Sequence, residues 1–214
     1  YNRFACCGRG CCLCSDKTQK VNKQIMETIH FTKGSWEDKL VYGYTRRYEV
    51  FPEFIAEADH VRNRADPNNE YGFENISVFS PRALARGGRI STRCRFEGEA
   101  APLIVLAEEL ERGENGKLRF GNYIEVVLWK NGINVWRMFY DGNSVTWKKL
   151  FGMPYDVDGS EMQEFSAAFE ENGITVTHGE RSFFLRIEDL PEKYYAGVDA
   201  CEGICRFYSI TAKE

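Results

Sequence analysis

The residues best suited to chemistry lie near the middle of the chain, where one carboxylate stands among aromatic side chains. Glu125 lies in the run from Tyr123 to Trp129, and the next two runs add tryptophans, a tyrosine and an amide. Flat rings that stack on a ligand, with a few polar groups that orient it, are typical of small-molecule sites. The candidate ligand-binding residues are Tyr123, Trp129, Asn134, Trp136, Arg137, Tyr140 and Trp147.

Three consecutive β-strands are expected to position these side chains. The strands cover residues 122–129, 133–140 and 144–149, and their joints are Asn131-Gly132 and Asp141-Gly142. Both dipeptides are strong hairpin signals, because the favoured two-residue turn needs positive φ at both central positions.

The register of the first hairpin follows from a two-residue loop at Asn131-Gly132, which pairs Lys130 with Ile133. Residues that oppose each other share a face. One face is then mainly aliphatic and is expected to be core, with the pairs Leu128 and Val135, Val126 and Arg137, and Ile124 and Phe139. The other face carries the aromatic rings, and is either a binding surface or a second buried layer.

The face of the third strand depends on the length of the second turn. A two-residue loop at Asp141-Gly142 places Val145 and Trp147 on the aromatic face, whereas a three-residue loop moves both to the aliphatic face.

A catalytic carboxyl group that cleaves a bond by hydrolysis normally works with a second carboxyl group on the other side of that bond. Glu125 is the candidate catalytic residue, but it has no second carboxylate on its own strand. The candidates for a partner from another strand or loop are Glu97, Glu108, Asp199 and Glu202. A lyase would instead need a base and a cation, for which Tyr123, Arg137 and His60 are available types.

Five of the eight cysteines lie between Cys6 and Cys14. The spacings of Cys7, Cys11 and Cys14 match iron–sulfur motifs, and Cys11 and Cys14 could also hold zinc with neighbours or with Cys201 and Cys205. The alternative is a segment that binds no metal. Because a secreted disulfide framework spreads its cysteines through the fold, this clustering favours a reducing, cytoplasmic compartment.

The composition is that of a globular chain, with 214 residues, 43% apolar residues and a net charge of −4. No basic stripe is present, so nucleic acid is not an expected partner. No apolar run approaches the length of a membrane span.

Two regions are expected. Residues 1–35 form a cysteine-rich head with a short amphipathic helix, because Val21, Ile25 and Ile29 recur every four residues. Residues 36–214 form a single all-β domain, an antiparallel β-sandwich with turn signals about every 8–12 residues and minimal helix. One or two helical turns are expected between Ser80-Pro81 and Gly87-Gly88.

Three stretches carry a resemblance to a known superfamily. The hairpin over 122–137, the turn-rich run 172–179 and the final run 196–210 resemble the strands of concanavalin A-like (laminin G-like) lectin and glucanase domains. The resemblance covers roughly residues 36–214 and implies a jelly-roll sandwich. The superfamily includes sugar-binding modules, hydrolases, lyases and protein-binding domains, so it does not select a function.

The superfamily suggests two properties, a catalytic motif and a calcium site. Laminarinase-type hydrolases carry a Glu, an Asp two residues later and a Glu five residues after the first, whereas Glu125 is followed at those positions by Val127 and Lys130. The resemblance also implies a stabilising calcium ion, for which Glu57, Asp59 and Asp199 are the candidate ligands.

The first hypothesis is therefore a non-catalytic protein that binds an oligosaccharide or polysaccharide. The alternatives are a glycan-active hydrolase or lyase that uses Glu125, and a structural or protein-interaction module in which the aromatic face is an interface between subunits.

Overall fold

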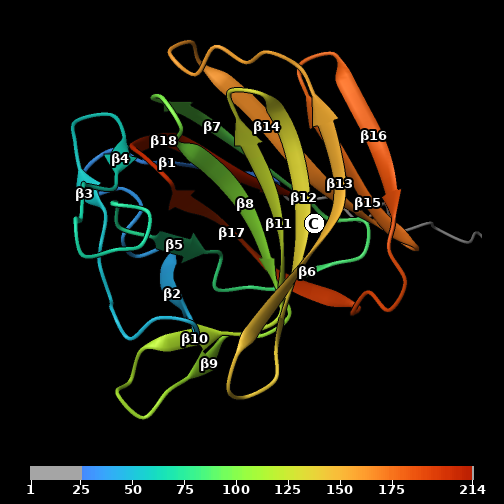
Figure 1. Ribbon diagram of the computed structural model, residues 1–214, viewed down its shortest axis with the longest axis horizontal. Helices are drawn as coiled ribbons and strands as arrows, with labels where there is room; N and C mark the ends of the chain where they lie inside the picture. The colour runs from blue at the N-terminus through green and yellow to red at the C-terminus, as the bar shows by residue number, and fades with distance from the viewer. Residues whose placement is uncertain (1–25, 214) are drawn as a thin grey trace, which may run out of the picture.

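The computed structural model describes residues 26–213, and every regular element in this part of the chain is a β-strand. The strands form two sheets that face each other (Figure 1), which confirms the predicted β-sandwich. All pairings between the described strands are antiparallel except that of β10 with β2.

The first sheet has the order β16-β15-β14-β7-β18-β4-β3, and β1 also pairs with β18. Its strands are β1 (Met26–His30), β3 (Ile55–Ala56), β4 (Val61–Arg62), β7 (Arg89–Phe96), β14 (Gln163–Glu170), β15 (Gly173–His178), β16 (Arg181–Arg186) and β18 (Cys205–Lys213).

The second sheet has the order β13-β12-β11-β8-β17-β5-β2-β10-β9, and β6 also pairs with β17. Its strands are β2 (Val41–Thr45), β5 (Ile76–Phe79), β6 (Leu84–Ala85), β8 (Ala101–Ala107), β9 (Glu111–Arg112), β10 (Leu118–Phe120), β11 (Tyr123–Trp129), β12 (Gly132–Tyr140), β13 (Val145–Pro154) and β17 (Lys193–Cys201).

The helical predictions are wrong where the structure tests them. Ile29 lies in β1, where the neighbouring strand β18 supplies the backbone hydrogen bonds, so the four-residue spacing did not mark a helix. The remainder of that predicted helix lies outside the described residues. The segment after Pro81 contains the short strand β6 and no helix. Within residues 26–213 no helix has the length and apolarity that a membrane span requires.

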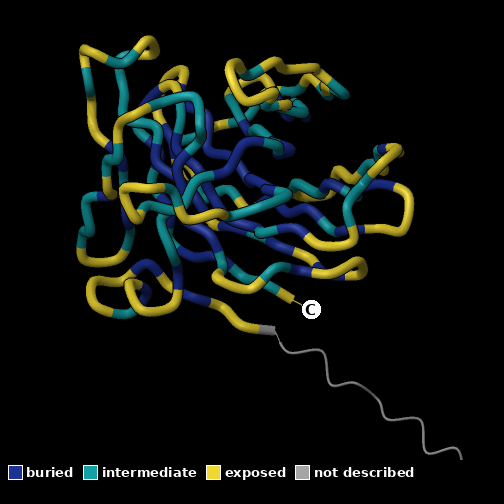
Figure 2. The backbone as a smooth tube through the Cα atoms, turned by 90° about the horizontal axis from the view of Figure 1, so that it is seen from below, coloured by how far each residue is buried: buried dark blue, intermediate teal, exposed yellow. Residues whose placement is uncertain are grey.

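The core lies between the two sheets, and Figure 2 shows the buried residues concentrated there and the exposed residues at the turns. Burial alternates along strand β7, where Ile90, Thr92, Cys94 and Phe96 are buried. Strand β8 is a continuous apolar run and is buried along its whole length. Burial of each such large apolar side chain contributes about 1.5–3 kcal/mol to folding.

The predicted register of the central hairpin is wrong by two residues, but the predicted faces are confirmed. Leu128 pairs with Ile133 rather than Val135, because the loop is Lys130-Asn131 and Gly132 pairs with Trp129. Only Gly132 in this turn has positive φ, at 116°. A slip of two residues preserves the faces of a strand, since side chains alternate with a period of two.

Gly132 is expected to be essential to this hairpin. A Cβ atom at this position would meet the Met153 carbonyl oxygen at 2.1 Å, in a backbone conformation that L-residues avoid. Gly132→Ala should therefore lower the free energy of unfolding by about 3 kcal/mol or more, as measured by urea denaturation. The control is Gly142→Ala: its φ is also positive, at 97°, but no atom lies within 4 Å of the added Cβ. That variant should lose only about 1 kcal/mol, and equal losses would contradict the steric argument.

The second sheet curls back on itself. Strands β10 and β11 are separated only by Gly121 and Asn122, and β10 pairs with β2 while β11 pairs with β8. Side chains of the inner face fill one end of the curl and form a small second core: Phe79, Leu103, Val105, Ala107, Phe120 and Tyr123. A cleft lies at the other end of the inner face.

Candidate functional site

A cleft of about 400 Å³ lies on the inner face of the curled sheet. The β11–β12–β13 hairpins form one side of it, and β17, the loop after β2 and the segment before β5 contribute the other polar groups. Its principal lining residues are Arg47, Tyr48, Tyr71, Asn75, Glu125, Trp129, Asn134, Trp136, Trp147, Asp199, Cys201 and Glu202.

Five of the predicted residues meet in this cleft. Glu125 pairs with Trp136 across the hairpin, and Trp129 and Asn134 share their face. Trp147 pairs with Met138 and joins the same face, as the two-residue-turn alternative predicted, although the connection between β12 and β13 has four residues. Trp147 is 57% exposed, so a large apolar surface is open to solvent at the mouth of the cleft.

The other three predicted ligand-binding residues have different positions. Tyr123 reaches the cleft only as its floor: it is 6% exposed and its ring centroid lies 4.9 Å from that of Phe120. The interpretation of the aromatic face as a second buried layer is therefore right for this end of the sheet.

Arg137 and Tyr140 do not line the cleft. Arg137 pairs with Ile124 on the opposite face, where its guanidinium group lies 3.3 Å from a Glu108 carboxylate oxygen. Tyr140 lies in a neighbouring polar groove and donates a hydrogen bond to the Gly142 carbonyl at 2.7 Å. The register of a hairpin assigns each residue to a face of the sheet, but it does not show where that sheet curls away from the cleft.

Glu125 lies in the middle of the cleft, with its side chain half-buried. Burial raises the pKa of its carboxyl group to about 8, and the nearby Asp199 and Glu202 carboxylates add to this shift. A carboxylic acid of this kind holds its proton at neutral pH and can donate it.

Asp199 approaches the cleft from β17. Leu103 pairs with both Val127 and Asp199, so one strand separates β11 from β17, with about 10 Å between their backbones. Burial raises the pKa of Asp199 to about 7, while a hydrogen bond from Ser77 favours its ionised form.

Asn75 also supports the ionised form of Asp199. With its amide nitrogen directed towards Asp199, it donates to both carboxylate oxygens at 2.9 Å. Hydrogen bonds that favour a charged carboxylate lower its pKa. Burial therefore raises the pKa of both carboxyl groups, and Asp199 has hydrogen-bond donors that favour its ionised form.

The turn between β17 and β18 carries Cys201 and Glu202 along the same wall. Glu202 has a φ of 56°, a conformation rare for a residue with a side chain. Burial raises the pKa of Glu202, and the charge of Glu99 raises it further. Backbone strain of this kind persists where the surrounding structure holds it in place.

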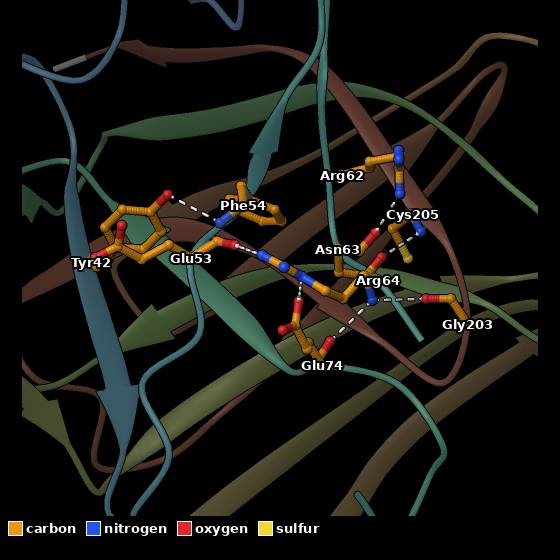
Figure 3. A network of polar contacts seen from close by, with 9 residues as sticks. All are labelled: Tyr42, Glu53, Phe54, Arg62, Asn63, Arg64, Glu74, Gly203 and Cys205. Atoms are coloured by element: carbon orange, nitrogen blue, oxygen red, sulfur yellow. Dashed lines mark hydrogen bonds and ion pairs between the residues drawn. The ribbon is translucent and has the colours of Figure 1, made fainter. Parts of the chain in front are cut away.

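Asn63 stabilises this turn through buried hydrogen bonds (Figure 3). Its side chain is fully buried, donates to the carbonyl oxygens of Glu74 at 2.9 Å and Gly203 at 2.8 Å, and accepts from the Cys205 backbone N–H at 3.0 Å. The adjacent Arg64 binds the Glu74 carboxylate at 2.8 Å. One amide therefore ties the β4–β5 segment to the turn that carries Glu202.

Replacing Asn63 by alanine is expected to lower the free energy of unfolding by about 2–4 kcal/mol, because three buried backbone groups lose their partner. The melting temperature measures this loss. The control is Asn115→Ala, which removes a single hydrogen bond to the Lys117 backbone in an exposed loop and should lose less than about 1 kcal/mol. A loss as small as the control's would show that the turn does not depend on Asn63.

Arg47 closes one end of the cleft. Its guanidinium group lies 2.5 Å from a Glu70 carboxylate oxygen, 5.0 Å from the ring centroid of Tyr48 and 5.4 Å from that of Trp147. The loop after β2 therefore meets β13, although five strands lie between β2 and β13 in the sheet order.

Sequence reasoning missed four polar or aromatic contributors, Arg47, Tyr48, Tyr71 and Asn75. No spacing in the sequence links these four residues to Glu125. Of the proposed carboxylate partners, Asp199 and Glu202 reach the cleft. Glu97 instead pairs with Arg206 at 2.6 Å, and Glu108 pairs with Arg137.

None of the predicted metal sites is assembled among the residues that the structure describes. Cys11 and Cys14 lie outside residues 26–213. Within that range, no group of three or more His, Cys, Asp or Glu residues is arranged to hold a metal ion. The calcium candidates are separate: Glu57 pairs with Arg62, Asp59 lies 2.8 Å from His60, and Asp199 lies in the cleft. His60 itself is outside the cleft lining.

The two sheets and their curvature define a concanavalin A-like, jelly-roll fold. No protein-family model and no curated protein sequence matches the chain.

Solved structures show the fold likeness. Carbohydrate-binding module CBM66 from Bacillus subtilis has a TM-score of 0.57 and 9% identity, covering 79% of this chain and 98% of its own. β-Agarase A from Zobellia galactanivorans has a TM-score of 0.60 and 10% identity, covering 90% and 93%. Rv0315 of Mycobacterium tuberculosis, a pseudo β-1,3-glucanase, has a TM-score of 0.55 and 10% identity, covering 87% and 97%. These identities are low, so the likeness extends to the fold alone.

Proposed function

We propose that this protein binds an oligosaccharide in the cleft. The observation that carries the proposal is the pairing of two unlike walls, with Trp129 and Trp136 on one side and hydrogen-bonding groups from Asn75 and Asp199 on the other. Sugar rings have apolar faces that stack on aromatic side chains and hydroxyl groups that need polar partners. A concave site with a few placed polar groups suits such a ligand better than a flat protein interface.

The fold neighbours support the choice of ligand class, since they include a carbohydrate-binding module and a β-agarase. The test is a thermal-shift screen of the full chain with agaro-oligosaccharides and β-1,3-gluco-oligosaccharides as the first probes. A saturable rise in melting temperature that follows the ligand concentration is the expected result, because a ligand that binds only the folded state stabilises it. No rise across these and a broader set of glycans would contradict the proposal.

A second candidate function is cleavage of the bound glycan, and the carboxyl pair specifically favours it. Glycoside hydrolysis uses one protonated carboxyl group to donate a proton to the leaving oxygen and one carboxylate as nucleophile or base. Glu125, with its raised pKa, suits the first role, and the hydrogen-bonded Asp199 suits the second. Release of reducing ends from a glycan that binds in the screen would establish cleavage. Binding without release would leave the protein as a lectin.

A further inference from the structure

More acidic than basic side chains line the cleft. Three carboxyl groups line it, those of Glu125, Asp199 and Glu202, and Arg47 is the one cationic side chain among the described lining residues. A second cation, Lys149, lies beside the lining, with its ammonium group 5.6 Å from the ring centroid of Trp136. All three acidic residues line the same cleft as Trp129 and Trp136.

The charge of Arg47 is already compensated within the protein. Glu70 binds its guanidinium group at 2.5 Å, and the Tyr48 hydroxyl donates to the same Glu70 oxygen at 2.9 Å. The rings of Tyr48, Tyr71 and Trp147 cover the guanidinium group at centroid distances of 5.0–6.0 Å. A ligand anion would have to displace Glu70 to pair with Arg47, and it would still meet the carboxyl groups of Asp199 and Glu202.

We infer, resting on the proposed function, that the cleft selects uncharged sugars and rejects glycans that carry sulfate or carboxylate groups, with Asp199 and Glu202 as the specificity-determining residues. A cleft lined by one sign of charge focuses its potential inward, so it repels a ligand of the same sign. A like charge about 6 Å away lowers the affinity roughly threefold at the dielectric of water and roughly a hundredfold at that of a protein surface, so a difference of about tenfold is expected in this partly open cleft.

The strained backbone of Glu202 is consistent with a defined role for its side chain. Glu202 combines its positive φ with a place in the cleft lining, and the hydrogen bond from Asn63 to the Gly203 carbonyl stabilises the turn. Strain that is maintained by a buried network is a feature of functional sites.

The test compares a neutral and an anionic form of one glycan by isothermal titration calorimetry. The probes are agaro-oligosaccharides and β-1,3-gluco-oligosaccharides, each beside its O-sulfated derivative of the same length. At neutral pH and low ionic strength the neutral form should bind at least about tenfold more tightly, and high salt should narrow this ratio because it screens exposed charges.

Variants separate charge from size, because a sulfate group is also larger than a hydroxyl group. Asp199→Asn and Glu202→Gln should each reduce the neutral-to-sulfated affinity ratio severalfold, whereas Glu161→Gln, at an exposed position outside the lining, should leave the ratio unchanged. Equal affinities, preference for the sulfated form, or a ratio that neither salt nor these variants alter would overturn the inference while leaving glycan binding in place. Failure of all probes to bind would overturn the proposed function, and the selectivity with it.

Discussion

Replacing Trp136 by alanine is expected to weaken oligosaccharide binding at least about thirtyfold while the protein remains folded. Trp136 pairs with Glu125 at the centre of the cleft, and Lys149 lies over its ring at 5.6 Å, so its position is well defined. Aromatic residues at the centre of a binding site commonly contribute about 2 kcal/mol or more, which corresponds to this factor. Titration calorimetry with the glycan identified by thermal shift measures the loss.

Phe139→Ala is the matched control for Trp136. Phe139 lies three residues further along β12, is 41% exposed, and belongs to the opposite face of the strand. Its replacement removes a similar aromatic surface without changing the cleft, so the affinity should stay as in the parent. Unchanged affinity in Trp136→Ala would show that the tryptophan wall is not the binding surface. Loss of a concentration-dependent oligomer in that variant would instead favour the interaction-module hypothesis.

The sandwich and the composition of the central faces could be predicted from the sequence because both depend on local alternation. A two-residue error in the loop left Trp136 and Glu125 on one face, since the faces of a strand repeat every two residues. Local patterns were less reliable for the helices, because the apolar spacing around Ile29 also suits a strand that pairs with a distant neighbour.

The remainder of the site could not be predicted because it depends on long-range pairing and on curvature. Asn75 and Asp199 meet because β5 and β17 are neighbours in the sheet, although the two residues are far apart in sequence. Tyr123 is buried because β10 and β2 bring Phe120 against it. The position of Arg137 on the other face, in contrast, follows from the predicted register. No residue spacing encodes how far a sheet curls.

Replacing Glu125 by glutamine is expected to stabilise the protein increasingly as the pH rises from about 4.5 to 8. The pKa of Glu125 is about 8 in the folded protein, compared with an ordinary value of 4.5. A carboxyl group whose pKa is raised on folding supports the folded state at low pH, where both states are protonated. That support is lost as the pH rises through the folded pKa. Glutamine is neutral at every pH, so the variant does not lose stability in this way as the pH rises.

The gain at pH 8 should be about 2 kcal/mol, or about 4–8 °C in melting temperature. This figure is below what the full pKa shift implies, because the side chain of Glu125 is partly open to the cleft. At pH 4 the variant and the parent should have the same stability. Glu161→Gln, at an exposed site, should show no gain at either pH. A loss of stability in Glu125→Gln at pH 8 would show that the carboxylate is paired and not isolated.

The same variant separates the two candidate functions. If Glu125 donates a proton to a leaving glycosidic oxygen, Glu125→Gln should lower turnover about 10²–10⁴-fold, while the glycan still binds and the protein is more stable. A residue that lowers stability and is retained for its chemistry is the usual compromise of an active site. If the protein only binds, the variant should gain the same stability and keep its affinity, because the stacking surface of Trp136 is unchanged.

Asp199→Asn should lower the pKa of Glu125 in either case, because the Asp199 charge contributes to its elevation. The pH range over which the gain from Glu125→Gln increases should then end at a lower pH in the Asp199→Asn background, and the gain at pH 8 should be smaller. An unchanged range would show that the two carboxyl groups do not interact, and would remove the basis for assigning them a shared reaction.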